Sequence, residues 1–424
     1  LSAVSMPAGN SVSAGGFDGE LVAAEGTAWV PKDRSIWELS VEANPRKKAD
    51  KDYQKRTLTV PEEVRKQVTY VAVTGRKWPQ RSEWAKSKIA LIQWKDIKAY
   101  DAEDIELWLE QESATQIWFA DHLNLHSGAL KSPERYWLDW NRDVSPPVSL
   151  EAVLANRERE RDKLFQLFAM KAQGGTIVIH ADSSEEAVAF ACAAIIRNEG
   201  QASPRCVIVK DTNGWDVIAS SSNVDVAIAT ETTIASEVPR KDGLILLVPV
   251  ATGDSEAHFS GHRGSGIHLD ICLQRTLPEA FRDALVDMGL DRGDSERLAL
   301  QCGRSWSVYR RVKNGNPAQR QPTWLEERHA PALTTLALIG AYSEHNEADQ
   351  KWVEKVAGIP FREFADQAER LIRRGDAPII RINGVIKAKS PLEIFMMNEA
   401  GVSPDMFGRF LNVCEAVLTQ PSQP

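Results

Sequence analysis

The sequence predicts an α/β protein of several domains that ends in a largely helical region. Its 424 residues are more than one ordinary hydrophobic core organises, since domains usually hold about 100–200 residues. Short apolar runs of strand length alternate with helical segments as far as residue 275, and helical patterns dominate from residue 276 onward. We therefore expect four segments, at 1–145, 146–275, 276–330 and 331–424.

The composition excludes several classes of protein. A content of 43% hydrophobic and 26% charged residues is typical of globular proteins, and no apolar run approaches the roughly 20 residues of a membrane span. The formal net charge of −8 means that any DNA contact must be local. The five cysteines form no CxxC pair, which favours a reducing, cytoplasmic location. Because the chain begins at Leu1 without a signal-peptide pattern, we expect a fragment or a trimmed protein.

The first segment is expected to form a small α/β domain. Strand patterns occur at 20–23, 35–39 and 68–73, a polar helix is expected at 45–56, and Pro61 opens another helix. Six tryptophans are expected to fill the core of this domain, namely Trp29, Trp37, Trp78, Trp84, Trp94 and Trp108.

The second segment begins at a proline pair, 146–147, and one charged helix is expected at 149–173. Further along, apolar strands alternate with helices such as 184–199, which predicts a mostly parallel sheet covered on both faces. The strands are expected at 176–180, 206–210, 224–228 and 244–248.

The remaining segments carry weaker patterns. Residues 295–312 indicate helix, glycine turn and helix, which fits a DNA-binding helix-turn-helix or, as we favour, the helical lid of an NTPase-like module. His258 and His262 have the spacing of metal ligands on a helix, but the surrounding glycines favour a loop without metal. Residues 331–424 predict a helical or winged-helix adaptor in which Asn383-Gly384 forms a tight turn between two strands.

Two carboxylates indicate a metal site in the first segment. Asp18 lies in Gly15-Gly-Phe-Asp-Gly19, and Glu38 follows at the end of the next predicted strand. Carboxylates on adjacent strands can share a Mg²⁺ or Mn²⁺ ion, which activates water and stabilises charge on a phosphate. The helix at 45–56 then places Lys47, Lys51 and Lys55 on one face.

These residues, with the strand that ends Val73-Thr-Gly-Arg-Lys-Trp78 and the segment 97–109, resemble the PD-(D/E)xK nuclease superfamily. The resemblance implies a restriction-endonuclease-like fold in which Asp18 and Glu38 bind metal and act in catalysis. Ser40 stands where the superfamily has lysine, and members can carry that lysine on a neighbouring helix. The resemblance therefore implies Lys48 as the catalytic lysine, ahead of Lys47 and Lys51, and DNA contacts from Lys47, Lys51, Lys55 and Arg56.

The second segment lacks a phosphate-binding loop. The loop between the strand at 176–180 and the next helix has neither the glycines nor the lysine of a P-loop, and Asp182, Glu185 and Glu186 would repel a triphosphate. Such acids instead cap a helix and complement its dipole. The order of elements resembles a degenerate, STAND-like P-loop NTPase module, as in large bacterial anti-phage defence-associated proteins, and no ATP binding is expected.

The leading hypothesis is a Mg²⁺- or Mn²⁺-dependent endonuclease that cuts double-stranded DNA in bacterial defence and is fused to a non-hydrolysing NTPase-like regulatory region. A distal sensor domain outside this chain and a homo-oligomer are the further partners that this hypothesis predicts. Two alternatives stay open: a catalytically inactive nuclease-fold binding or assembly module, and a DNA-binding regulator that uses residues 295–312.

Overall fold

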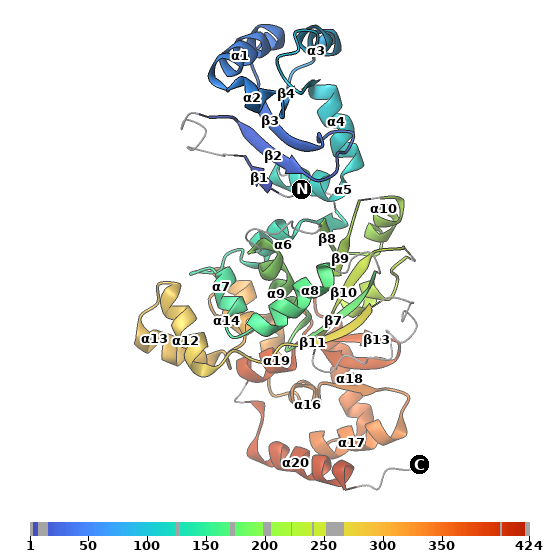
Figure 1. Ribbon diagram of the computed structural model, residues 1–424. Coiled ribbons are helices and arrows are strands. Elements are labelled where there is room, and N and C mark those ends of the chain that lie inside the picture. Colours follow the sequence, from blue (N-terminus) through green and yellow to red (C-terminus); the bar gives the residue numbers. More distant parts are fainter. Residues whose placement is uncertain are drawn as a thin grey trace. The chain divides into compact units, whose positions relative to one another are not determined.

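The protein has a mixed α/β structure (Figure 1). The computed structural model describes residues 3–6, 16–123, 125, 128–169, 174–197, 205–221, 223–239, 241–251, 267–398 and 401–419. The chain forms two compact units, Leu1–Gln116 and Ile117–Pro424. None of the described helices has the length and apolar character needed to cross a bilayer.

The first unit is built on a five-stranded sheet with strand order β1-β2-β3-β4-β5. Strand β2 is antiparallel to both of its neighbours, β1 and β3, whereas β3, β4 and β5 run parallel to one another. The strands are β1 (Ala3–Ser5), β2 (Gly19–Ala23), β3 (Asp33–Ser40), β4 (Thr69–Thr74) and β5 (Asp96–Tyr100). The helices are α1 (Pro45–Thr59), α2 (Glu62–Arg65), α3 (Arg81–Ile89) and α4 (Ala102–Gln111), followed by α5 (Ser113–His122), which continues beyond Gln116.

Successive side chains of the strands in this unit alternate between two buried clusters. Ile36 and Tyr70 pack with α1 and α3 residues such as Tyr53, whereas Trp37 and Val71 belong to a second cluster. Because successive side chains of a strand point to opposite faces, Glu38 lies on the same face as Ile36, toward α1. The predicted strands, the helix at 45–56 and the helix after Pro61 are confirmed.

The second unit contains a six-stranded sheet with order β11-β7-β10-β9-β8-β6. All its pairings are parallel except that of β6 with β8, so the predicted mostly parallel sheet is confirmed. The strands are β6 (Leu130–Lys131), β7 (Gly175–Ala181), β8 (Cys206–Val209), β9 (Val226–Ala229), β10 (Ile245–Ala251) and β11 (Ile267–Cys272). Helix α9 (Ser184–Ile196) packs on β7 and β10 and is buried at every position from Glu186 to Ile195.

Further helices belong to this unit, and most of them contribute residues to the buried cluster of the sheet, which extends from Trp140 to Tyr309. They are α6 (Pro133–Trp140), α7 (Leu150–Leu154), α8 (Glu158–Ala169), α10 (Gly214–Ser220), α11 (Thr232–Ala235), α12 (Pro278–Asp287), α13 (Arg292–Gln301), α14 (Trp306–Val312) and α15 (Pro317–Arg320). The helix–glycine–helix pattern is confirmed as α13, Gly303 with a φ of 55°, and α14.

The last part of the chain packs around a separate cluster that extends from Trp324 to Ile394. It contains the 3₁₀ helix η5 (Thr323–Glu327) and the three-stranded sheet of β12 (Ala341–Ser343), β14 (Val385–Ala388) and β13 (Ile379–Ile382). The tight turn at Asn383-Gly384 is confirmed, since both residues have positive φ, 50° and 77°. The helices are α16 (Pro331–Ile339), α17 (Glu347–Ala357), α18 (Phe361–Ile372), α19 (Pro391–Met397) and α20 (Pro404–Leu418).

Two expectations about segment limits differ from the structure. The first compact unit ends at Gln116 and not near 145, because β6 pairs with β8 and Trp140 of α6 enters the core of the second sheet. The helix expected at 149–173 is divided into α7 and α8. Asn156 has a φ of 59° at the break, and the buried Arg157 that follows makes long-range contacts with Glu186 and Gln274. Residues 170–173 lie outside the described part of the chain.

Candidate functional site

Helix α1 presents three charged side chains to the sheet. Asn44 caps the helix by accepting a hydrogen bond from the Lys47 amide at 3.0 Å, and Pro45 begins it. Lys48, Asp52 and Arg56 then follow at intervals of four residues, so they lie on one face. Because α1 packs on β3, this face lies against Glu38.

Glu38 is held by one of these cations. Its side chain is only 6% exposed and forms an ion pair with the Arg56 guanidinium. The same guanidinium donates a second hydrogen bond to the Gly16 carbonyl oxygen and lies 5.0 Å from the centre of the Phe17 ring. Arg56 therefore connects β3 to the segment that precedes β2.

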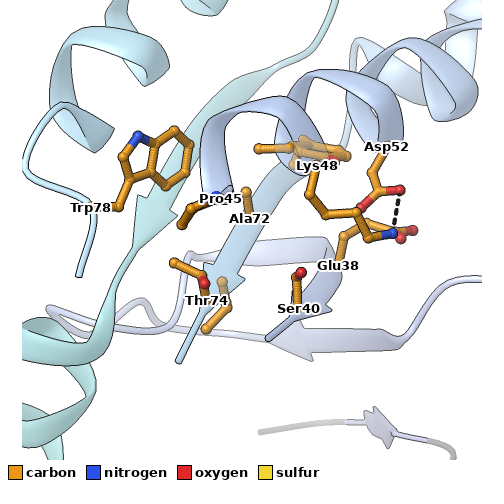
Figure 2. A pocket seen from close by; sticks show the side chains of 11 residues that line it. Glu38, Ser40, Pro45, Lys48, Asp52, Ala72, Thr74 and Trp78 are labelled. Carbon is orange, nitrogen blue, oxygen red and sulfur yellow. Dashed lines mark hydrogen bonds and ion pairs between the residues drawn. The ribbon is translucent and has the colours of Figure 1, made fainter. Parts of the chain in front are cut away.

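Lys48 is positioned beside Glu38 by a neighbour on its own helix. Its ammonium group lies 2.8 Å from Oδ1 of Asp52. Figure 2 shows Lys48 and Asp52 on α1 above Glu38, with Ser40 and Thr74 where β3 and β4 end. Hydrogen bonding to Asp52 raises the pKa of Lys48, and the charges of Glu38 and Asp18 act in the same direction. Lys48 is therefore a fixed positive charge at neutral pH.

Asp18 is fixed next to the strand that carries Glu38. Its Oδ2 atom accepts a hydrogen bond from the backbone amide of Leu39 at 2.8 Å. In the antiparallel register, Gly19 pairs with Trp37, so the preceding residue, Asp18, lies beside Glu38. The structure therefore brings together the two acids that the sequence singled out.

The site carries more negative than positive charge. Burial raises the pKa of Glu38, the Arg56 hydrogen bond and charge oppose this rise, and the charges of Asp18 and Asp52 add to it. Three carboxylates, those of Asp18, Glu38 and Asp52, thus share two cations, Lys48 and Arg56. Such an excess of negative charge attracts a further cation.

A small pocket lies between α1 and the ends of β3 and β4. Glu38, Lys48, Asp52 and Tyr70 all line it, and its volume is about 10 Å³, room for a species about the size of one water molecule. The buried Tyr70 hydroxyl has no hydrogen-bond partner among the described residues. Burial and the nearby Glu38 and Asp52 charges raise the pKa of Tyr70, so its hydroxyl stays protonated.

The donors of this site fit a hard divalent cation. Mg²⁺ is commonly bound through one or two carboxylates together with water and substrate oxygens, and Asp18 and Glu38 supply that number. The described residues contain no group of three or more His, Cys, Asp or Glu side chains that could hold one metal ion. The Arg56 guanidinium already pairs with Glu38, so an ion at this carboxylate would have to compete with it.

The other predicted contact residues on α1 are divided between two surfaces. Lys47, Lys51 and Lys55 are exposed. Arg56 differs, because only 9% of its side chain is exposed and its charge is directed to Glu38. It therefore belongs to the site and not to the exposed lysine face.

Asp52 and Tyr70 were not singled out from the sequence. Asp52 could have been found from the spacing of Lys48, Asp52 and Arg56, in which charges alternate at successive turns next to the apolar Tyr53. Tyr70 carries no such signal, because an aromatic residue in an apolar strand is ordinarily part of the core.

In the second unit, the β7–α9 loop and the first turn of α9 together carry three acid–arginine pairs. Asp182 pairs with Arg275 at 2.8 Å, Glu185 with Arg310 at 2.5 Å, and Glu186 with Arg157 at 2.7 Å. Ser183 caps α9, since its hydroxyl accepts a hydrogen bond from the Glu186 amide at 3.2 Å. The acids near the start of α9 are thus neutralised by side chains from other segments.

Helix α14 is a core helix. Trp306, Val308 and Tyr309 are buried, Arg310 pairs with Glu185, and Arg311 pairs with Glu393 at 2.7 Å. A recognition helix needs an exposed face that can enter a DNA groove, and these contacts do not suit α14 to that role. His258 and His262 lie outside the described residues.

Comparison with known proteins adds no assignment. No protein-family model matches the chain, and no curated protein matches it significantly.

Proposed function

We propose that this chain is a metal-dependent endonuclease that hydrolyses phosphodiester bonds in DNA. The observation that carries the proposal is the meeting of Asp18, Glu38 and Lys48, two acids and a lysine, at one end of a mixed sheet. The strand and helix order around them is compatible with a PD-(D/E)xK, restriction-endonuclease-like fold.

Each residue has a defined part in this proposal. Asp18 and Glu38 would hold Mg²⁺ or Mn²⁺, which when bound supplies an activated water and neutralises phosphate charge. Lys48 places a fixed positive charge next to Glu38, suited to stabilising charge that develops on the phosphate. Asp52 keeps Lys48 protonated and in place. Asp52 is therefore a positioning residue.

DNA contact is proposed for the exposed face of α1. Lys47, Lys51 and Lys55 provide charge for phosphate groups on the face next to the one that carries Lys48. Since the whole chain is acidic, such binding is local and sensitive to salt.

The second unit is proposed to be a regulatory region with an NTPase-like arrangement that does not hydrolyse ATP. The three acid–arginine pairs in the β7–α9 loop and the first turn of α9 support this proposal, because the acids repel phosphate and engage the arginines that could bind it. A role in bacterial defence and a distal sensor domain follow from the resemblance in sequence pattern alone.

Cleavage of supercoiled plasmid tests the proposed activity. The full chain should nick plasmid with Mg²⁺ or Mn²⁺ and not with EDTA, and Glu38→Gln should abolish nicking. Lys48→Met should slow it by about 10²-fold, because one electrostatic contact to the reacting group is lost. Lys351→Gln, an exposed change in α17, serves as the control. Full nicking by Glu38→Gln would refute the assignment.

A second function is favoured by the Arg56–Glu38 ion pair. The Arg56 guanidinium pairs with Glu38, the acid proposed to bind metal. This pairing is compatible with a nuclease fold that has lost catalysis and acts as a binding or assembly module. That protein would bind DNA or a partner equally well with Mg²⁺ and with EDTA, and it would not nick plasmid under either condition.

A further inference from the structure

We propose that Arg56 is an internal cation that occupies Glu38 in place of a metal ion, so that a divalent cation binds this site by displacing the Arg56 guanidinium. This inference rests on the proposed function, because it concerns the same carboxylate. It assigns Arg56 a role of its own, as the residue that sets the affinity of the site for a divalent cation.

The contacts of Arg56 are those of a counter-ion to a buried acid. Nε binds Oε1 of Glu38, and a terminal nitrogen donates to the Gly16 carbonyl oxygen. Both charged side chains are shielded from water, with exposures of 9% and 6%. A buried carboxylate requires a compensating charge, and Arg56 is the cation in contact with Glu38.

Lys48 does not take this role. Its ammonium group is engaged by Asp52, and its distance to that carboxylate is 2.8 Å. Removal of the guanidinium would leave Glu38 next to two further acids, Asp18 and Asp52, at a point where the pocket has room for about one water-sized species. A divalent cation supplies twice the charge of the guanidinium and satisfies Asp18 at the same time.

The structure also provides a partner for the displaced guanidinium. Asp52 precedes Arg56 by one helical turn, a spacing at which an acid and an arginine on a helix form an ion pair. If Arg56 paired with Asp52, the ion pair between Asp52 and Lys48 would be weakened. Exchange at Glu38 would thus make Lys48 available to a bound phosphate.

The test compares Mn²⁺ binding to the full chain and its variants, measured by electron paramagnetic resonance of the free ion. Arg56→Gln should bind Mn²⁺ at least about tenfold more tightly than the wild type, since a competing charge next to the ion is gone. Lys351→Gln, the exposed control change in α17, should leave the affinity unchanged. Glu38→Gln should bind weakly with or without Arg56.

Equal or weaker Mn²⁺ binding by Arg56→Gln would overturn the inference, and it would leave the proposed function intact if the wild type still nicks plasmid in a Glu38-dependent manner. Absence of both binding and nicking in the wild type and in Arg56→Gln would overturn both. If Arg56→Gln does not fold by circular dichroism, Arg56→Lys carries the test. A lysine lacks the planar fork that joins Glu38 and Gly16, so its Mn²⁺ affinity should exceed that of the wild type. An affinity no higher than that of the wild type would overturn the inference.

Discussion

Glu38 combines burial with charge in a way that makes the site sensitive to pH. It faces Lys48, Asp52 and Arg56 of α1, Asp18 before β2 and Tyr70 of β4. Burial raises its pKa, and Arg56 limits that rise. A raised pKa means that the carboxylate takes up a proton at a higher pH than an ordinary glutamate, for which the pKa is about 4.3.

Mn²⁺ binding should therefore weaken as the pH falls from neutral through the raised pKa of Glu38, above the range in which an ordinary glutamate titrates. The ion requires the deprotonated carboxylate, so the loss is on the acid side. Titration of Mn²⁺ affinity against pH measures this effect, and Glu38→Gln should remove the step. An affinity that stays constant down to the ordinary glutamate range would contradict the assignment.

The Arg157–Glu186 pair in the second unit is a buried ion pair that lies outside the site. Both side chains are 3% exposed, and Glu186 also accepts a hydrogen bond from Ser305 at 3.2 Å. Arg157→Met should lower the free energy of unfolding by about 3–5 kcal/mol, because Glu186 would remain buried without its partner. Urea denaturation measures this change.

Two further variants test whether the lost ion pair causes the destabilisation of Arg157→Met. The double variant Arg157→Met/Glu186→Leu should lose less free energy of unfolding than Arg157→Met alone, since no unpaired charge remains. Arg292→Met breaks an exposed pair with Glu296 and should change the stability little. Equal losses in Arg157→Met and in the double variant would show that the ion pair is not the source of the effect.

At the scale of single elements, α1 has two adjacent charged faces with different tasks. The triple variant Lys47→Gln/Lys51→Gln/Lys55→Gln should weaken DNA binding and reduce the slope of log affinity against log salt by as much as about 0.9 per lysine. Mn²⁺ affinity should not change, because these side chains are exposed whereas Glu38 is buried. Fluorescence anisotropy with labelled duplex DNA at several salt concentrations checks both statements, with Lys351→Gln as the control. An unchanged salt slope would exclude this face as the DNA contact.

Two glycines in the last part of the chain should respond in opposite ways to replacement by alanine. Gly384 has a φ of 77°, and a Cβ there would lie 2.8 Å from Cδ2 of His345. Gly408 lies within α20 and has nothing within 4 Å of an added Cβ. Gly384→Ala should thus destabilise by more than about 1 kcal/mol, whereas Gly408→Ala should stabilise by about 0.5–1 kcal/mol. Urea denaturation of both variants decides the matter, and destabilisation by Gly408→Ala would contradict this account of α20.

At the scale of the whole molecule, each compact unit has buried clusters of its own. Trp94 is 5% exposed, belongs to the cluster around Tyr53 and Tyr70, and donates a hydrogen bond to Thr57 at 3.0 Å. Trp94→Ala should destabilise the first unit by about 3–5 kcal/mol and leave the melting of the second unchanged. Differential scanning calorimetry should show one lowered transition, and the exposed Leu91→Ala should shift neither. Equal shifts of both transitions would mean that the units unfold together.

Local patterns in the sequence were sufficient for most elements. The strands at 35–39 and 68–73, the helix at 45–56, the parallel strands of the second unit and the Asn383-Gly384 turn follow from periodicity and turn chemistry, which act over a few residues. The sequence also identified Asp18, Glu38 and Lys48, which the fold brings together.

The other features of the fold and of the site depend on packing between residues that are distant in the sequence. A polar helix such as α1 has no apolar stripe from which its buried face could be predicted. Successive side chains on a helix are also rotated by about 100°, so neighbouring residues lie on different faces. Only contact with β3 therefore separates Lys48, Asp52 and Arg56 from the exposed Lys47, Lys51 and Lys55. The break before Arg157 likewise depends on Glu186, 29 residues away, and the end of the first unit depends on the pairing of β6 with β8. Such partners are distant in the chain, so no local pattern could reveal them.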